Sequence, residues 1–317
     1  MQYKYCGKSG LQLPLISLGL WHNFGFEDDT QTARKMILHA FDKGITHIDI
    51  ANNYGPPPGA AETTFGRILK NDLAAHRDEL IISSKAGHLM WDGRYGDGGS
   101  RKYLMASINQ SLKRTNLEYF DIFYSHRYDP KTPIEETMQA LVDIVRQGKA
   151  LYIGISKYPP KEAQRAFDYL KENNVPCLIF QDKYNLLHRN VENKILDLCE
   201  ENGTGFIAFS PLSQGILTEK YLNEIPQYSR AKDAHGYLKT SQITETDLEK
   251  VRTLQPLAEK RNQTIAQLSL AWILNNPKVT SVIVGARNLE QLQANIDTLE
   301  NLHLSSEEVS NINNIFL

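Results

Sequence analysis

The sequence predicts an α/β fold, a closed (β/α)8 TIM barrel that forms a single domain over residues 1–317. Three observations favour this fold. Short apolar segments alternate with segments of helical periodicity, and eight such strand-and-helix pairs follow one another along the chain. The expected strands are apolar on both faces, as is typical of buried parallel strands. The length of 317 residues suits one barrel, and no change in composition marks a second domain.

The expected strands begin with a hairpin ahead of the barrel. Residues 3–5 and 11–13 are short candidate strands, and Gly7 and Gly10 lie between them. The barrel strands are then runs of apolar and β-branched residues bounded by turn residues. In chain order they span residues 15–20, 46–51, 80–85, 120–126, 150–156, 177–184, 206–211 and 280–286.

Apolar residues at helical spacing predict a helix after each barrel strand. The first helix ends at Gly44, a good C-cap, and the sequence Thr132-Pro133-Ile134-Glu135 predicts a capping box with proline at the first helical position. A second capping box opens the terminal helix at Ser305, and residues 212–243 are expected to be irregular. The remaining helices are expected at 62–70, 100–116, 132–148, 159–173, 191–202, 244–262, 264–276, 288–300 and 305–316.

Composition argues against several functional classes. The net charge is −2 and the basic residues are scattered, so neither nucleic acid nor a membrane surface is an expected partner. The N-terminus lacks an apolar signal core, and no stretch approaches the roughly 20 apolar residues of a membrane span, so we expect a cytoplasmic protein. Cys6, Cys177 and Cys199 have neither CxxC spacing nor paired histidines nearby, so we expect no disulfide and no metal site.

Four polar residues mark the carboxyl ends of successive expected strands. Asp49 lies near the end of the second barrel strand, and Tyr54 lies on the proline- and glycine-rich loop that follows. Lys85 and His126 end the next two strands. Singly, each has an ordinary explanation as a turn cap, a surface aromatic, a solvated lysine or a core histidine. Together they would meet at one barrel mouth, where such folds build their sites.

Carbonyl reduction is the chemistry that uses this set of residues. Hydride delivery to a carbonyl carbon leaves charge on the oxygen, and Tyr54 can supply the proton if its pKa falls from about 10. Lys85 would favour the phenolate, and Asp49 would hold the lysine. His126 would orient the carbonyl oxygen through a hydrogen bond. None of these residues carries hydride, so a nicotinamide cofactor is required.

A series of short motifs ties these residues to a known family. They are HIDIANNYG, IISSK, IFYSH, GIS, FSPL and IVGARNLEQLQANI, in this order along the chain. In kind, order and spacing they resemble the aldo-keto reductases, and the resemblance runs from Gly10 to about Leu299. It implies that Asp49, Tyr54, Lys85 and His126 are the catalytic tetrad of that family.

The resemblance also implies NADPH, bound in an extended pose without a Rossmann unit. The nearest dinucleotide fingerprint, Gly203-x-Gly205-x-x-Ala208, precedes a strand and is therefore interpreted as a helix-ending turn. A guanidinium near the last two barrel strands suits a 2′-phosphate, which favours NADPH over NADH. The cofactor-binding residues implied are Ser156, Gln181, Phe209, Ser210, Pro211, Leu212, Gln214, Gly215, Arg230, Gly285, Arg287, Gln291 and Asn295.

Four further segments are SLGLWHNFG at 17–25, ANNYGPPPGAAE at 51–62, GGSRKYL at 98–104 and FYSHR at 123–127. They resemble family members that reduce a triose phosphate aldehyde and related aldehydes such as methylglyoxal. A phosphorylated aldehyde needs cationic donors near the mouth, and Arg127 could supply them together with Lys157, His22 and Arg94. Trp21 would form an apolar wall. The alternative for Arg127 is an ion pair with an acid such as Asp129. Relatives often form homo-oligomers, so we expect the same here.

Two other functions remain open at this level. Potassium channel β-subunits share the barrel, the tetrad and the cofactor loop, yet act chiefly as regulatory binding partners. A barrel isomerase or aldolase would instead use Lys85 as a Schiff base. The match of Tyr54 and of the cofactor loop favours reduction over this third reading.

Overall fold

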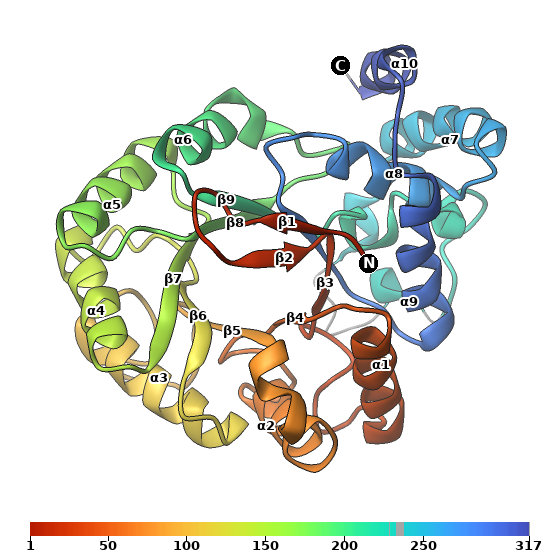
Figure 1. Cartoon of the computed structure of the whole chain (residues 1–317). Coiled ribbons are helices and arrows are strands. Elements are labelled where there is room, and N and C mark those ends of the chain that lie inside the picture. The colour runs from red at the N-terminus through yellow and green to blue at the C-terminus, as the bar shows by residue number, and fades with distance from the viewer. Residues whose placement is uncertain (228, 233–237, 317) are drawn as a thin grey trace.

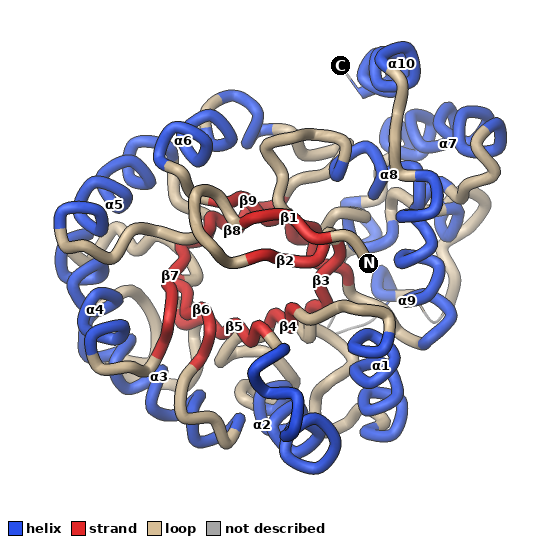
Figure 2. Tube along the Cα trace, viewed as in Figure 1, coloured by secondary structure: helices blue, strands red, loops and turns tan. Residues whose placement is uncertain are grey.

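Eight parallel strands close into a barrel at the centre of the computed structural model, which describes residues 1–227, 229–232 and 238–316 (Figures 1 and 2). The strands follow the order β10-β3-β4-β5-β6-β7-β8-β9, so the predicted (β/α)8 barrel is confirmed. Arg230 is described by its backbone alone. The strands are β3 (Ile16–Gly19), β4 (His47–Asp49), β5 (Ile81–Ala86), β6 (Phe120–Ser125), β7 (Ala150–Ser156), β8 (Ile179–Lys183), β9 (Gly205–Phe209) and β10 (Ser281–Val284).

The helices form an outer ring around the strands (Figure 2). Because this ring covers the outside of the barrel and side chains fill its inside, every residue of β3, β4, β5, β6 and β10 is buried. Two helices beyond the eightfold repeat, α7 and α10, pack against each other at the edge of the ring (Figure 1). The helices are α1 (Thr30–Asp42), α2 (Ala60–Ile68), α3 (Arg101–Thr115), α4 (Ile134–Arg146), α5 (Pro160–Glu172), α6 (Ile195–Asn202), α7 (Glu245–Lys260), α8 (Ile265–Leu274), α9 (Leu289–Ile296) and α10 (Ser306–Phe316).

The predicted N-terminal hairpin covers one end of the barrel. Strands β1 (Tyr3–Tyr5) and β2 (Gln12–Pro14) pair antiparallel and lie across the barrel in Figure 1. Lys4 Nζ donates to the Val279 carbonyl at 2.9 Å, and Cys6 Sγ donates to the Leu178 carbonyl at 3.4 Å. Leu178 immediately precedes β8 and Val279 lies two residues before β10, so the hairpin closes the amino-terminal end. The carboxyl ends of the strands are left for a site.

Three local predictions need correction. Pro133 is the N-cap of α4 without a side-chain cap bond, and the Thr132 hydroxyl donates instead to Asp129 at 2.8 Å, so no capping box forms there. The helix expected over 191–202 is split, because Lys194 leaves the helical region at φ −158°. Strand β4 ends at Asp49, two residues earlier than expected. The terminal capping box is confirmed by reciprocal bonds between Ser305 and Glu308.

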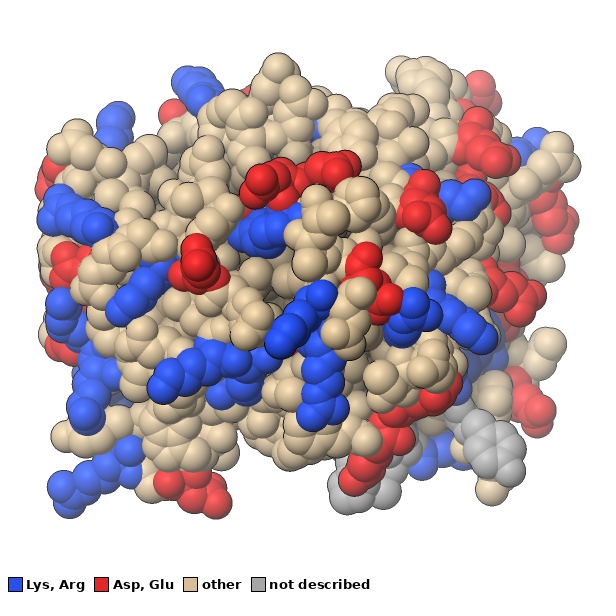
Figure 3. Space-filling view, turned by 60° about the horizontal axis from the view of Figure 1, so that its bottom comes forward, with Lys and Arg blue, Asp and Glu red and all other residues tan. Residues whose placement is uncertain are grey.

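The surface and the thiols agree with the composition. Basic and acidic side chains lie among one another on the face shown in Figure 3, in keeping with a net charge of −2. All three cysteines are buried and unpaired, so the expectation that they form no disulfide with one another is confirmed. Among the helices of the described residues, none has the length and hydropathy that crossing a bilayer requires.

Candidate active site

A cavity of about 1180 Å³ opens at the carboxyl ends of the barrel strands. Its wall is built from the last residues of the strands and from the loops that follow, where a parallel barrel leaves backbone and side chains uncovered. Three of the four predicted catalytic residues line it: Asp49, Tyr54 and His126. Lys85 lies directly beneath, fully buried.

Asp49 and Lys85 form a buried ion pair at the floor of the cavity. Lys85 Nζ lies 2.6 Å from Asp49 Oδ2 and also donates to the Ile50 carbonyl at 2.6 Å. Neither side chain is more than 3% exposed. Burial lowers the pKa of Lys85, while the charge and hydrogen bond of Asp49 act in the opposite direction. The pair therefore holds an ammonium at a fixed place in a low-dielectric wall.

Tyr54 reaches this pair from the loop after β4. The Lys85 Nζ donates to its hydroxyl at 3.5 Å and lies 4.9 Å from the ring centroid. The loop is fixed by two backbone bonds, from the Tyr54 amide to Ala51 at 3.1 Å and from the Ala61 amide to Tyr54 at 3.2 Å. Gly55 is required next to it, because a Cβ there would lie 2.0 Å from the Pro57 carbonyl oxygen.

His126 completes the group from the residue after β6. Its ring lies edge-on to the Tyr54 ring, with centroids 5.8 Å apart. Burial, together with the nearby cations Lys85 and Lys157, lowers the pKa of His126 well below its usual value. At neutral pH the imidazole is therefore uncharged and offers one N–H donor and one acceptor nitrogen.

A chain of buried polar groups continues below the pair, and sequence reasoning missed it. Asp49 Oδ1 accepts from Ser83 Oγ at 2.8 Å, and Ser83 in turn contacts His47 Nε2 at 3.1 Å. His47 Nδ1 contacts Ser17 Oγ at 2.9 Å, and Ser17 contacts Ser281 Oγ at 2.8 Å. This chain crosses the barrel interior from β10 to β5 and fixes the carboxylate from below.

The residues expected to hold a cofactor gather along the same cavity. The Ser156 hydroxyl is buried in the wall without a hydrogen-bond partner among the described residues. It could therefore form a hydrogen bond with the carboxamide of a nicotinamide. The Gln181 Nε2 donates to Asp49 at 3.1 Å, which connects this part of the wall to the pair of Asp49 and Lys85. The other predicted cofactor residues in the wall are Phe209, Ser210, Pro211, Leu212, Gln214, Gly215, Gly285, Arg287, Gln291 and Asn295.

The far end of the cavity suits a phosphate. Arg287 precedes α9, its backbone amide donates to the Gln291 side chain at 3.0 Å, and Asn288 caps the helix through the Gln291 amide. A guanidinium at a helix N-terminus beside the last two barrel strands is a favourable place for an anion. The prediction for Arg230 concerns a side chain outside the described part of the chain.

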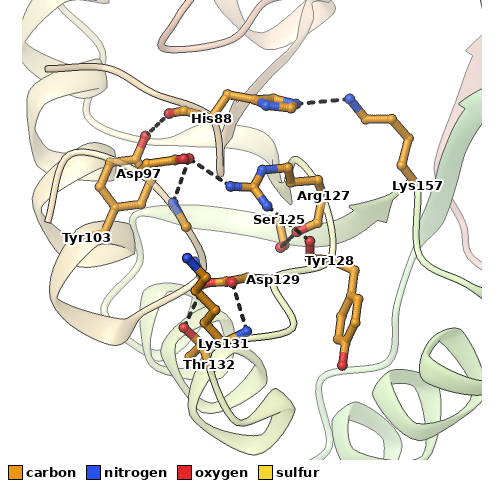
Figure 4. Close-up of polar contacts among 12 residues, drawn as sticks. His88, Asp97, Tyr103, Ser125, Arg127, Tyr128, Asp129, Lys131, Thr132 and Lys157 are labelled. Carbon is orange, nitrogen blue, oxygen red and sulfur yellow. Dashed lines mark hydrogen bonds and ion pairs between the residues drawn. The ribbon is translucent and has the colours of Figure 1, made fainter. Parts of the chain in front are cut away.

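The two predicted substrate residues, Trp21 and Arg127, lie in different positions relative to the cavity. Trp21 lines the cavity, with its ring centroid 6.4 Å from that of Tyr54. Arg127 is not among the described residues of the cavity wall, so its contact with the substrate stays a prediction. Its guanidinium pairs with Asp97 at 2.9 Å, and Asp129, the acid considered for it, instead accepts from Thr132, Lys131 and Gly99 (Figure 4).

His88 is a site residue that sequence reasoning missed. It lines the cavity, and its ring lies edge-on to the His126 ring with centroids 4.5 Å apart. A histidine three positions after the strand-end Lys85 was the available signal. Among the described residues no group of three His, Cys, Asp or Glu side chains could hold a metal ion.

Comparison with known proteins gives a consistent result. The model of the Aldo/keto reductase family matches residues 15–316. The chain is 55% identical over 317 residues to the L-glyceraldehyde 3-phosphate reductase of Escherichia coli (strain K12), covering 98% of this chain and 91% of that protein. The protein of the same name from Escherichia coli O157:H7 matches equally. A probable voltage-gated potassium channel subunit beta of Oryza sativa subsp. japonica is 35% identical over 315 residues, covering 98% of this chain and 94% of that protein.

Proposed function

The chain is an oxidoreductase of the aldo/keto reductase family, and from this premise we propose that it reduces an aldehyde to an alcohol with NADPH. The observation that carries the proposal is the buried ammonium of Lys85, which contacts both the Asp49 carboxylate and the Tyr54 hydroxyl in the wall of the large cavity. Bound NADPH would supply the hydride that none of these side chains can carry.

Tyr54 acts as the proton donor in this proposal. As the carbonyl carbon gains hydride, the carbonyl oxygen gains the proton of the Tyr54 hydroxyl, and a phenolate remains beside the Lys85 ammonium at 3.5 Å. The ammonium stabilises that phenolate, and Asp49 keeps the ammonium in place. Solvent then returns the proton to Tyr54 after the alcohol leaves.

His126 orients the substrate. Because its imidazole is uncharged, it can donate one hydrogen bond to the carbonyl oxygen without competing as an acid. The edge-on contact with the Tyr54 ring puts both donors on one side of the cavity. The aldehyde oxygen would lie between them.

The aldehyde we propose is L-glyceraldehyde 3-phosphate, reduced to glycerol 3-phosphate, with methylglyoxal as a second substrate. The 55% identity to proteins named for the first reaction supports this assignment. Arg287 and the capped start of α9 support NADPH rather than NADH, because a guanidinium there can bind the 2′-phosphate.

An NADPH-oxidation assay tests the proposal directly. L-Glyceraldehyde 3-phosphate, its D-isomer, methylglyoxal and an aromatic aldehyde are compared by kcat/KM, first with NADPH and then with NADH. The expected order places the L-isomer first and NADPH above NADH. Absence of NADPH oxidation with every aldehyde would remove the proposed activity.

A second function is supported by the 35% identity to the potassium channel subunit. A regulatory subunit would keep its cofactor bound and turn over slowly. Single-turnover and steady-state rates measured on the same preparation distinguish the two, because an enzyme releases NADP+ repeatedly.

Location and assembly complete the proposal. NADPH and triose phosphates are intracellular metabolites, so we place the enzyme in the cytoplasm. We also expect a homo-oligomer, which light scattering of the purified protein measures.

A further inference from the structure

Lys157 is a cavity residue whose backbone is held in an unusual conformation. It follows the last residue of β7, lines the cavity, and has φ +56°. The left-handed region disfavours side chains with a Cβ, and asparagine and glycine enter it more readily than lysine. Its amide donates to the Gln181 carbonyl at 3.2 Å, which fixes the turn. A lysine kept in such a place points to a function for its side chain.

The Lys157 side chain is aimed at the substrate end of the cavity. Its Nζ lies 3.0 Å from His88 Nε2, a contact drawn in Figure 4, and 5.8 Å from the centroid of the Phe209 ring. Burial, with the nearby Lys157 and Arg127, lowers the pKa of His88 to about 4, so the neutral imidazole accepts a hydrogen bond from the Lys157 ammonium. The His88 carbonyl is itself held by the Tyr103 hydroxyl at 2.6 Å.

The carboxylates around the mouth are committed elsewhere. Asp49 pairs with Lys85. Figure 4 shows the second pair, between Asp97 and Arg127. Asp182, which faces Lys157 from β8, accepts from the Lys183 amide and forms no salt bridge with Lys157 among the described residues. An ammonium has three donors, and His88 uses one. Asp182 partly offsets the charge of Lys157 from a distance, but the ammonium forms no salt bridge among the described residues and keeps donors for an anionic ligand.

We propose that the Lys157 ammonium, positioned by His88, binds the anionic end of the aldehyde substrate. The proposal rests on the function proposed above and names the group that would recognise the phosphate of a triose phosphate. His88 contacts the His126 ring, and His126 contacts the Tyr54 ring. A short aldehyde can thus place its carbonyl between Tyr54 and His126 and its anionic group at Lys157. A carboxylate on the aldehyde would offer the same chemistry, so the test includes one.

The test compares variants on a matched pair of aldehydes. Lys157→Asn removes the charge and puts a residue in the left-handed turn that tolerates it better, so a folding defect is not expected. Lys157→Arg keeps a charge. Lys183→Asn is the control, because Lys183 also contacts a histidine, His188, at 2.9 Å but lies outside the cavity wall. Each is assayed with L-glyceraldehyde 3-phosphate, L-glyceraldehyde and succinic semialdehyde.

The decisive quantity is the ratio of kcat/KM for phosphorylated to unphosphorylated glyceraldehyde. For Lys157→Asn we expect this ratio to fall about 10- to 100-fold, the range for losing one charge-assisted hydrogen bond, while Lys157→Arg retains most of it and Lys183→Asn leaves it unchanged. A parallel fall with succinic semialdehyde would extend the site to carboxylates, and its absence would restrict it to phosphate.

Calorimetry tests whether Lys157 binds an anion, and this test does not depend on turnover. Inorganic phosphate is titrated into protein saturated with NADP+, so that the cofactor site is filled. Weaker phosphate binding in Lys157→Asn supports the proposal even if no aldehyde is reduced. Unchanged phosphate binding, an unchanged ratio, or a loss confined to the affinity for NADPH would overturn it while leaving the proposed reductase activity standing.

Discussion

Variants of the buried ion pair of Asp49 and Lys85 can separate its effect on stability from its proposed effect on turnover. In Lys85→Met the carboxylate of Asp49 loses its ammonium in a wall where it is 3% exposed, yet it keeps Ser83 and Gln181 as donors. Breaking a buried pair costs about 3–5 kcal/mol, and these remaining donors put the expected loss near the lower limit. Asp49→Asn leaves Lys85 with the Ile50 carbonyl and the Tyr54 hydroxyl, and we expect a loss of about 1–3 kcal/mol.

The double variant Asp49→Asn/Lys85→Met has no buried charge left at this place. Because neutral groups of similar size replace both partners, we expect it to be more stable than Lys85→Met alone, by about 2 kcal/mol. Turnover should be lost in Lys85→Met and in the double variant, since Tyr54 has lost the neighbouring ammonium in both.

Urea unfolding and an NADPH-oxidation assay on the four proteins check this. The exposed pair of Arg165 and Glu135 is the matched control, and its removal should leave the urea midpoint unchanged. If the losses in the double variant simply add, the pair is not a coupled buried unit. If the double variant recovers turnover, the role given to Lys85 is wrong.

Four further predictions concern neighbouring groups. Tyr54→Phe should lower kcat by at least about 100-fold and leave the NADPH dissociation constant nearly unchanged, which fluorescence titration measures; full activity would remove the proton-donor role. His47 is fully buried, and burial lowers its pKa from 6.5 to about 4. Between these pH values the unfolded chain binds more protons at His47 than the folded chain does. The free energy of unfolding is therefore unaffected by His47 above pH 6.5 and falls by roughly 3 kcal/mol as the pH drops to 4. Urea unfolding across that range should show a flatter profile for His47→Gln and an unchanged one for the exposed His303→Gln. Burial, with the cations Lys85 and Arg127 and against Asp182, lowers the pKa of Lys157 to about 8, so inhibition by inorganic phosphate should weaken as the pH rises through 8 in the parent but not in Lys157→Arg; equal weakening in both would contradict it. Arg287→Met should raise the dissociation constant for NADPH about 10- to 100-fold and change that for NADH little; an equal effect on both cofactors would argue against a 2′-phosphate contact.

The fold and the meeting of the four proposed catalytic residues were predictable for the same reason. In a parallel barrel every strand carries its carboxyl end to one mouth, so residues that end successive strands must meet even when they are far apart in sequence. Asp49, Lys85 and His126 follow this rule, and Tyr54 follows it through a short loop. Strands that are buried along their whole length appear in the sequence as short apolar runs, which allowed their positions to be predicted.

Side-chain partners across the mouth were not predictable, because they depend on how loops of different lengths come together. Arg127 could pair with several acids, and the loop carrying Asp97 brings that residue to it. Thr132 had the spacing of a helix cap, but Asp129 lies close enough to accept its hydroxyl. Lys194 interrupts a pattern that is periodic in sequence, because its backbone lies outside the helical region at φ −158°.

The sequence by itself determined the barrel, the mouth at which we propose the chemistry occurs and the four residues that meet there. Strand periodicity and strand ends are local properties of the sequence, and the topology then brings the strand ends together. Only the tertiary structure decided which charges remain available in the cavity. Asp97 reaches Arg127, Asp49 reaches Lys85, and Lys157 is left with the neutral His88. Charge compensation depends on distances of a few ångströms between separate loops, and no pattern along one chain encodes those distances.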